Sequence, residues 1–214
     1  MPILTKLHAF SLLTLYKPFD LAETQHLACT LEFLQATDAP FFRDTLAGHI
    51  TASAILTDPT RSSLLLIWHE KLRRWLQPGG HCEQDDVSLS AAARRELLEE
   101  TGLPRNACIL ATDMPFDVDV HPIPVRGAEP AHWHYDIRFL FVYGSSEGSE
   151  GSEGSEGSEG SEGSEGSEGS EGSERSEPSQ LSQLSQPVWP WRAVEEVAQW
   201  PEASLARLAQ KLQQ

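Results

Sequence analysis

The sequence predicts an α/β fold in which helices cover the faces of a sheet. Runs rich in β-branched and aromatic residues recur at 49–57, 63–68, 116–121 and 133–142, and such runs favour strands. Helical patterns come before these runs, between them at 89–101, and after them. The 214 residues, 39% of them hydrophobic, suffice for one globular domain with a core.

The N-terminal part, residues 1–45, is expected to be helical. Asp20 is a good N-cap residue, and the leucines after it recur at helical spacing to form one apolar stripe. The stripe consists of Leu21, Leu27, Leu31 and Leu34. Polar residues interrupt the apolar stretch at 7–16 and no small-residue cleavage site follows it, so a signal peptide is not expected.

The strand-favouring runs differ in pattern. Residues 49–57 and 63–68 flank the turn signal Asp58-Pro59-Thr60 and are predicted to pair. Asp and Val alternate through 116–121, whereas 133–142 is rich in aromatic and branched residues. Each of these two runs predicts a strand with one buried face.

The segment 89–101 is predicted to be a helix. It consists mostly of strong helix formers, and Ser88 or Ser90 can cap its start. Gly102 supplies a left-handed end, and Pro104 forbids continuation.

The C-terminal part is predicted to close the fold. Residues 188–191 return to the sheet, and 192–200 and 202–212 form two helices. The second of these helices has an apolar side made of Leu205, Leu208 and Leu212.

A repeated Gly-Ser-Glu triplet at 147–174 interrupts the chain. It contributes ten of the 32 acidic residues and no base, so the net charge of −16 falls to about −6 for the rest of the chain. Such a composition predicts a solvated coil. We therefore expect one domain made of 1–144 and 187–214, with 145–186 as a disordered, acidic, low-complexity insertion.

Composition also restricts partners and location. An acidic surface argues against a nucleic-acid partner, since phosphate backbones bind clustered Lys and Arg. No run approaches the length needed to span a bilayer, so no membrane partner is expected. Cys29, Cys82 and Cys108 are odd in number and widely spaced, which fits a reduced cytoplasm.

Three glutamates on the predicted central helix carry the chemical signal. Glu96, Glu99 and Glu100 stand at i, i+3 and i+4 and share one face. Repulsion between them destabilises the helix unless a divalent cation lies among their oxygens, and such hard ligands suit Mg²⁺ or Mn²⁺. Arg95 can pair with Glu99, and a preceding Pro-Gly-Gly turn can bring backbone N–H groups to an anion.

These residues resemble the box of the Nudix hydrolases. Its pattern is Gly, five residues, Glu, seven residues, then Arg-Glu-aliphatic-any-Glu-Glu-any-Gly-aliphatic. The second half matches throughout, as Arg95-Glu96-Leu97-Leu98-Glu99-Glu100-Thr101-Gly102-Leu103. Three other stretches, GHITASA from Gly48, WLQPGGH from Trp75 and PAHWHYD from Pro130, resemble a bacterial Nudix subgroup. The resemblance extends from about residue 40 to 143 and resumes weakly after 187.

The first half of the box departs from the pattern. Counting back from Arg95 puts Val87 at the Glu position and His81 at the Gly position. A shift by one residue recovers Gly80 and places Asp86 where Glu is expected, as if one residue were inserted. The carboxylate that assists the site is therefore one of Glu83, Asp85 and Asp86.

The resemblance implies a three-layer α/β/α sandwich with a mixed sheet and a metal-dependent hydrolase of a diphosphate linked to another group. Metal ions would neutralise the phosphates and activate the attacking water. Glu96, Glu99 and Glu100 would bind Mg²⁺ or Mn²⁺, and Arg95 would orient them. The general base would be Glu96 or Glu129.

Substrate-binding residues are expected at two places. Gly79, Gly80 and His81 follow one predicted turn and would approach a phosphate. His132, His134 and Asp136 alternate and share one face of a strand. They would bind substrate or an additional metal if that face lines the cleft, and otherwise form a hydrogen-bonded row.

Two other functions use the same fold. A prenyl diphosphate isomerase would need a poised cysteine, and Cys82 is present, but the motif around it does not suggest that reaction. A binding or regulatory module would not need the self-repelling glutamates. The leading hypothesis is a pyrophosphohydrolase of a nucleoside diphosphate derivative or related metabolite, acting as a monomer or homodimer.

Overall fold

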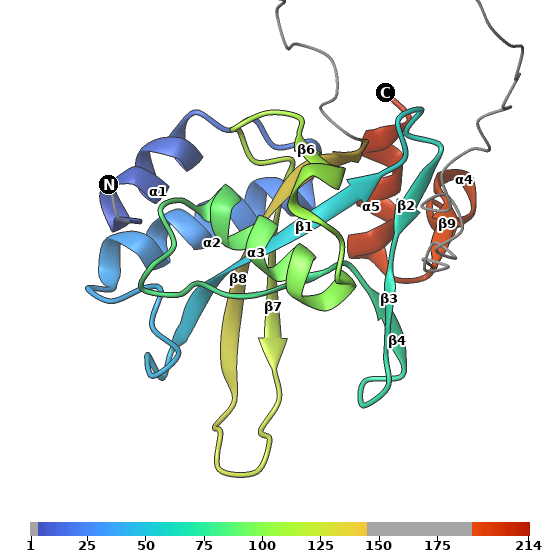
Figure 1. Ribbon diagram of the computed structural model, residues 1–214. Helices are drawn as coiled ribbons and strands as arrows, with labels where there is room; N and C mark the ends of the chain where they lie inside the picture. The colour runs from blue at the N-terminus through green and yellow to red at the C-terminus, as the bar shows by residue number, and fades with distance from the viewer. Residues whose placement is uncertain (1–3, 145–189) are drawn as a thin grey trace, which may run out of the picture. The chain divides into compact units, whose positions relative to one another are not determined.

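A computed structural model describes residues 4–144 and 190–214, and these belong to one compact unit (Figure 1). Its sheet has seven strands in this part of the chain. They are β1 (Gly48–Thr57), β2 (Ser63–Leu65), β5 (Gly79–His81), β6 (Cys108–Leu110), β7 (Asp117–Ile123), β8 (His132–Tyr143) and β9 (Trp191–Ala193). A separate two-stranded sheet contains β3 (Ile67–His69) and β4 (Arg74–Leu76). The predicted insertion at 145–186 lies wholly outside the described residues.

The sheet is mixed. Its strand order is β6-β8-β1-β2-β9, with β5 also paired to β1 and β7 to β8. The two longest strands, β1 and β8, run parallel, and their register sets His49 beside His134. The other pairs are antiparallel.

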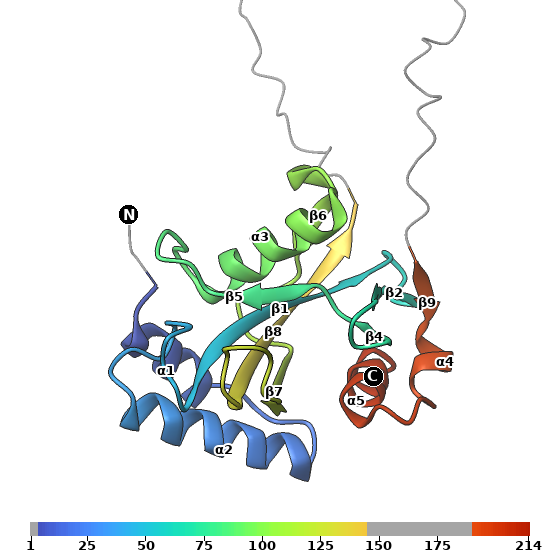
Figure 2. The same cartoon turned by 90° about the horizontal axis from the view of Figure 1, so that it is seen from below.

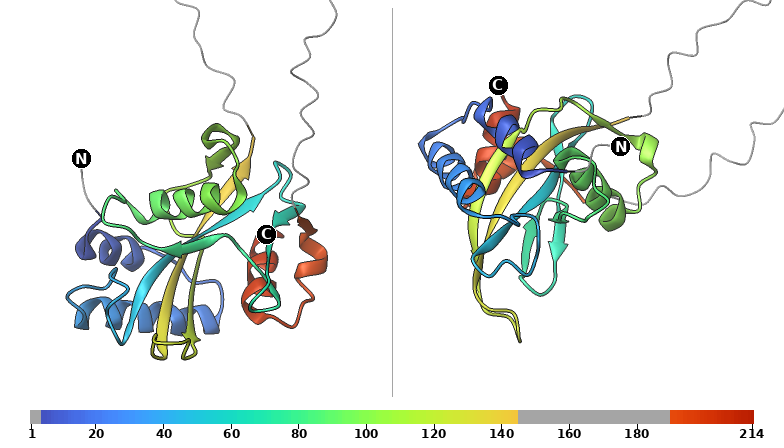
Figure 3. Two further views of the ribbon diagram at one scale, coloured as in Figure 1. Left: turned by 60° about the horizontal axis from the view of Figure 1, so that its bottom comes forward. Right: turned by 90° about the vertical axis from the view of Figure 1, so that its left-hand side faces the viewer.

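Helices cover both faces of the sheet. They are α1 (Lys6–Thr14), α2 (Leu21–Ala36), α3 (Leu89–Thr101), α4 (Val194–Val197) and α5 (Ala203–Leu212), with a 3₁₀ turn at Arg105–Ala107. A first core joins α1, α2 and α3 to the sheet, and a second joins α4 and α5 to it. Figures 2 and 3 show α3 along β1 and β5, and α4 and α5 beside β2 and β9. The predicted α/β sandwich is confirmed.

The predicted ends of the central helices are confirmed. The Asp20 side chain caps α2 by accepting from the backbone N–H of Glu23. Of the two candidate serines, Ser88 caps α3, accepting from the N–H of Ala91. Gly102 ends α3 in the left-handed conformation at φ 67°, which glycine adopts without steric cost.

The predicted apolar stripe of α2 is only partly correct. Leu21 is exposed, while Glu23 and Thr30 are buried beside Phe33 and Leu34. A buried Glu23 is stable here because its carboxylate accepts from the N–H of Val118 at 3.0 Å and pairs with Lys211 at 2.7 Å. The spacing of residues along α2 could not show that Val118 and Lys211 provide polar partners on its buried face.

Two strand predictions and one turn prediction need correction. The run 63–68 is broken after Leu65, so that β2 pairs with β1 while β3 turns away to pair with β4. The run 116–121 is buried on both faces, because the carboxylates of Asp117 and Asp119 form ion pairs in the interior. The predicted Pro-Gly-Gly turn places Gly79 and Gly80 in strand β5 instead.

The C-terminal predictions are mixed. The helix 202–212 is confirmed as α5, with Leu205, Leu208 and Leu212 buried. The helix predicted at 192–200 is only α4, since Trp191–Ala193 form β9. Residues 188 and 189 of the predicted returning strand lie outside the described part. Within that part, no helix is long and apolar enough to cross a membrane.

Candidate active site

A cleft of about 680 Å³ opens on the sheet face opposite the first core. Along β1, Ile50, Ala52, Ala54 and Leu56 pack into the first core. The alternate residues Thr51 and Ser53 line the cleft, and His49 is fully buried beneath it. The cleft floor is polar because the other half of the β1 pattern is polar.

Separate elements form the walls of this cleft. The β3–β4 hairpin contributes Trp75, the start of α5 contributes Ser204, and the loop between β7 and β8 contributes Arg126 and Glu129. The helix α3 contributes Glu96 and Glu100.

Two glycines of β5 let the α3 carboxylates reach the cleft. A Cβ atom on Gly80 would lie 2.6 Å from the carboxylate of Glu96. The N–H of Gly79 donates to Glu100 at 3.2 Å. The predicted anion at these glycines is thus, in this structure, a carboxylate of the chain itself.

Arg95 organises the acidic residues around the start of α3. Its guanidinium donates to both carboxylate oxygens of Asp86, at 3.0 and 3.3 Å. It also contacts Glu96 at 2.9 Å and Glu99 at 3.4 Å, and donates to the backbone carbonyl of His81 at 2.8 Å. Asp86 is therefore the acidic residue tied to the helix, while Asp85 is exposed and Glu83 lies 3.8 Å from Arg95.

The three glutamates differ in environment. Burial raises the pKa of Glu96, although Arg95 opposes the shift. Burial likewise raises the pKa of Glu100, opposed by the Gly79 N–H. Glu99 is 57% exposed and is absent from the described residues that line the cleft. Two of the three predicted ligands therefore line the cleft, and the third is exposed and contacts Arg95.

Histidines gather at the floor of the cleft. Ligand atoms of His49, His132 and His134 all lie within 4.8 Å of one another, and the ring of His81 lies 4.8 Å from that of His49. Burial, followed by the neighbouring imidazoles, lowers the pKa of His49 to about 4 and of His134 to about 2. Burial also lowers the pKa of His81. The low pKa values keep the rings of His49 and His134 neutral at pH 7.

A comparison with known protein families identifies the family of the segment that contains α3. The model of the NUDIX domain matches residues 48–162, a range that begins at β1 and includes the whole of α3. The chain belongs to the NUDIX family. It is a Nudix hydrolase.

Two solved structures show distant similarity to the chain. A NUDIX-family hydrolase from Clostridium perfringens is 18% identical, with a TM-score of 0.45, covering 77% of this chain and 96% of that chain. An Ap4A hydrolase from C. elegans is 16% identical, with a TM-score of 0.29, covering 42% of this chain and 67% of that chain. No curated protein matches the sequence.

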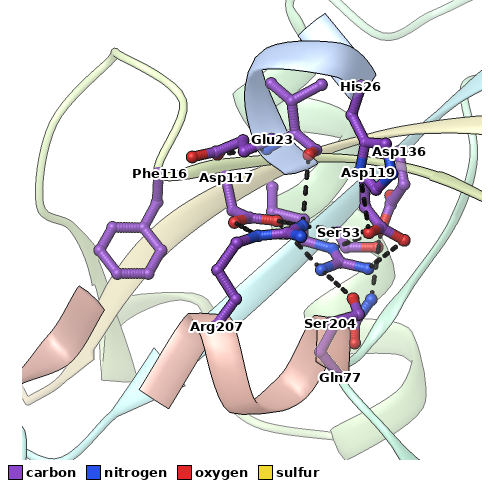
Figure 4. A network of polar contacts seen from close by, with 12 residues as sticks. Glu23, His26, Ser53, Gln77, Phe116, Asp117, Asp119, Asp136, Ser204 and Arg207 are labelled. Carbon is purple, nitrogen blue, oxygen red and sulfur yellow. Dashed lines mark hydrogen bonds and ion pairs between the residues drawn. The ribbon is translucent and has the colours of Figure 1, made fainter. Parts of the chain in front are cut away.

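Asp136 supports this Nudix cleft from below. One carboxylate oxygen accepts from Thr51 and Ser53, at 3.1 and 2.8 Å. The other accepts from Gln77 at 3.2 Å and from Arg138 at 2.8 Å. Arg138 continues into a buried network with Asp117 and Asp119 (Figure 4). Both Asp136 oxygens are thus occupied by the protein.

Glu129 and Cys82 are the other two residues that the sequence singled out. Glu129 pairs with Arg43 at 3.3 Å and lies 4.0 Å from the His132 ring, so it is at the histidine end of the cleft. Cys82 packs against the first core, and burial raises its thiol pKa. A neutral, packed thiol does not favour the isomerase alternative.

One histidine beneath this cleft is not among the residues that the sequence predicted. His49 lies between His81 and the β8 histidines. The signal was present in the alternation of His49, Thr51 and Ser53 with apolar residues along a predicted strand. What the pattern lacked was the parallel pairing with β8.

Proposed function

We propose that this Nudix hydrolase cleaves the diphosphate linkage of a nucleoside diphosphate derivative or a related metabolite, using Mg²⁺ or Mn²⁺. The observation that carries the proposal is the position of Glu96 and Glu100 in the cleft, against the backbone of Gly79 and Gly80. Both carboxylates are partly desolvated, and a dication would compensate the repulsion between them.

The residues fit a hard dication. Glu96, Glu99 and Glu100 offer carboxylate oxygens from successive turns of one helix face. Such an ion, when bound, neutralises phosphate oxygens and activates a water for attack on phosphorus. Glu99 is exposed and contacts Arg95 at 3.4 Å, so it would have to give up that contact to share an ion with Glu96 and Glu100.

The chain's own groups would position the substrate. Four arginines line the cleft. Arg138 is paired with buried aspartates, and the other three supply positive charge for a diphosphate: Arg43, Arg74 and Arg126. Arg95 would hold Glu96 in place through its pairing with Asp86. Gly79, Gly80 and His81 border the same cleft.

The general base is proposed to be Glu96, with Glu129 as the alternative. Burial raises the pKa of Glu96, which is the direction that suits a general base. Glu129 also lines the cleft, but its carboxylate is engaged by Arg43. Glu96 is therefore favoured.

Turnover of a panel of diphosphate compounds with Mg²⁺ or Mn²⁺ tests the proposal. Glu100→Gln should lower kcat by at least about 100-fold, since a metal carboxylate is replaced by a neutral amide. Glu32→Gln, an exposed change on α2, is the matched control and should keep full activity. Unchanged turnover in Glu96→Gln and Glu100→Gln would refute the carboxylate site.

The remaining proposals concern setting. The acidic charge and cysteine content support a cytoplasmic protein that binds a small molecule and not nucleic acid or membrane. We propose a monomer or a homodimer, which sedimentation of the full chain can test.

A further inference from the structure

We infer that His49, His132 and His134 form a binding site for a transition-metal dication of the Zn²⁺ class, separate from the carboxylate site on α3. The inference does not depend on which substrate is cleaved. Imidazole nitrogens suit Zn²⁺ and similar ions, whereas Mg²⁺ prefers oxygen. The donor set alone therefore distinguishes this site from that of the three glutamates.

The spacing of the nitrogen atoms supports the inference. The two Nε2 atoms of His132 and His134 are 3.2 Å apart. Two nitrogens bound to a tetrahedral Zn²⁺ ion at usual bond lengths are about 3.3 Å apart. The third ligand atom, from His49, belongs to a group spanning no more than 4.8 Å, a spread that small ring rotations can contract.

The backbone fixes the orientation of His132. Its Nδ1 lies 2.9 Å from the carbonyl oxygen of Pro130, which can only accept, so the proton is on Nδ1. In the neutral ring this leaves a lone pair on Nε2, directed toward His134. A backbone carbonyl behind the distal nitrogen is the usual support of a metal-binding imidazole.

The burial of His49 supplies an independent observation. Its side chain is fully buried, and among the described residues neither ring nitrogen has a hydrogen-bond partner. Buried polar atoms without partners are rare because each costs free energy. A row of hydrogen-bonded histidines leaves both nitrogens of His49 unexplained, whereas a metal ion takes up one lone pair.

The neighbouring strands place this ion within reach of the substrate. His132 and His134 line the cleft that also contains Glu96 and Glu100. Three protein ligands leave a coordination position open, which is the arrangement of zinc sites that bind water or substrate. The carboxylate of Glu129 lies 4.0 Å from His132 Nε2 and is paired with Arg43.

Metal titration of the full, untagged chain tests the inference. After chelator treatment, Co²⁺ should give the intense visible absorption of a tetrahedral site with one equivalent bound, and Zn²⁺ should displace it in calorimetry. Excess Mg²⁺ should not. His132→Gln and His134→Gln should each weaken Zn²⁺ binding at least about tenfold, while His8→Gln, an exposed change on α1, should leave it unchanged.

Two further measurements make the result decisive. Nitrogen NMR of histidine-labelled wild-type protein should show three imidazoles shifted by Zn²⁺, which needs no variant to fold. Glu100→Gln should lose Mg²⁺-dependent turnover yet keep Zn²⁺ binding, so that the two sites fail separately. No uptake of Zn²⁺ or Co²⁺ by the wild type, fewer than three shifted imidazoles, or wild-type affinity in both histidine variants would overturn the inference.

Discussion

The hydrogen at the α-carbon of Gly80 is all that fits between β5 and the carboxylate of Glu96, because a Cβ there would lie 2.6 Å from the carboxylate carbon and from both oxygens. The role of Gly80 is therefore to leave room for the Glu96 carboxylate at the cleft, and Gly80 lies in strand β5 and not in a turn. The backbone of Gly80 needs no positive φ, so any residue could adopt its conformation. The restriction comes from one side chain.

Gly80→Ala should impair activity with little loss of stability. The new methyl group would push aside the flexible end of Glu96, so the free energy of unfolding should change by no more than about 1 kcal/mol. Displacement of a proposed metal ligand and base should lower kcat/KM on the order of 100-fold. Steady-state kinetics and urea unfolding measure the two effects. Gly144→Ala, where a Cβ meets nothing within 4 Å, is the control.

Gly79→Ala should instead destabilise the fold. A Cβ on Gly79 would lie 2.7 Å from the Cβ and 2.8 Å from the Cα of Ser53, so β5 would have to move away from β1. Overpacking of this kind costs about 1–3 kcal/mol. Thermal unfolding should show a lower Tm than for Gly80→Ala, and an equal Tm in the two variants would contradict the assignment.

Asp86→Asn should weaken the Arg95 cluster. Asp86 is nearly buried and its carboxylate takes both ends of the guanidinium. Loss of this charged pair should cost about 1–3 kcal/mol of unfolding free energy and lower kcat, because Arg95 also contacts Glu96. Asp85→Asn, one residue earlier and exposed, should do neither. Equal effects at both positions would show that Asp86 has no special role.

Acid should destabilise the protein through Asp117. Burial alone would raise the pKa of this carboxyl, but Arg207, Arg138 and Lys211 lower it below its ordinary value. The unfolded pKa is about 3.9, so the stabilisation is present above about pH 4 and is lost as pH falls toward the folded pKa. Urea unfolding from pH 7 to pH 2 should show this loss.

Two variants, Asp117→Asn and Asp113→Asn, distinguish the contribution of Asp117 from the protonation of other carboxylates at low pH. Asp117→Asn should cost about 3 kcal/mol at pH 7, since it leaves three buried cations undercompensated, and should flatten the decline below pH 4. Asp113→Asn, at an exposed position, should follow the wild-type curve. A wild-type slope in Asp117→Asn would place the acid sensitivity elsewhere.

Deletion of residues 148–174 should leave folding and turnover close to wild type. The segment is a Gly-Ser-Glu repeat without apolar side chains, and halving a flexible loop changes its closure free energy by only about 0.6 kcal/mol. The described elements on either side, β8 and β9, belong to one sheet. Circular dichroism, Tm and the diphosphate assay check the prediction. Loss of both folding and activity would mean that the repeat is structural.

Local sequence features predicted the parts of this site that depend on neighbours along the chain. The start and end of α3 follow from Ser88 and Gly102. The Ser88 side chain accepts a hydrogen bond from a backbone N–H of the first turn, and Gly102 ends the helix in the left-handed conformation. The shared face of Glu96, Glu99 and Glu100 follows from helical spacing. The two-residue period of a strand likewise placed His132 and His134 on one side of β8.

Other features depended on contacts between distant segments. The inserted residue before Arg95 left three acidic candidates, and only the folded loop selects Asp86. The alternating acids of β7 predicted a solvated face, yet Arg138 and Arg207 bury it. A cation supplied from another element offsets the usual cost of burying a carboxylate. The local sequence pattern of β7 does not predict that cation.

The sequence by itself determined that three carboxylates share a helix face and that two histidines share a strand face, because both periods are properties of the backbone. Only the tertiary structure decided that parallel pairing of β1 and β8 brings His49 to those histidines, and that β5 presents two glycines to the helix. Strand register and close approach are set by packing across the whole chain, which residue spacing does not encode.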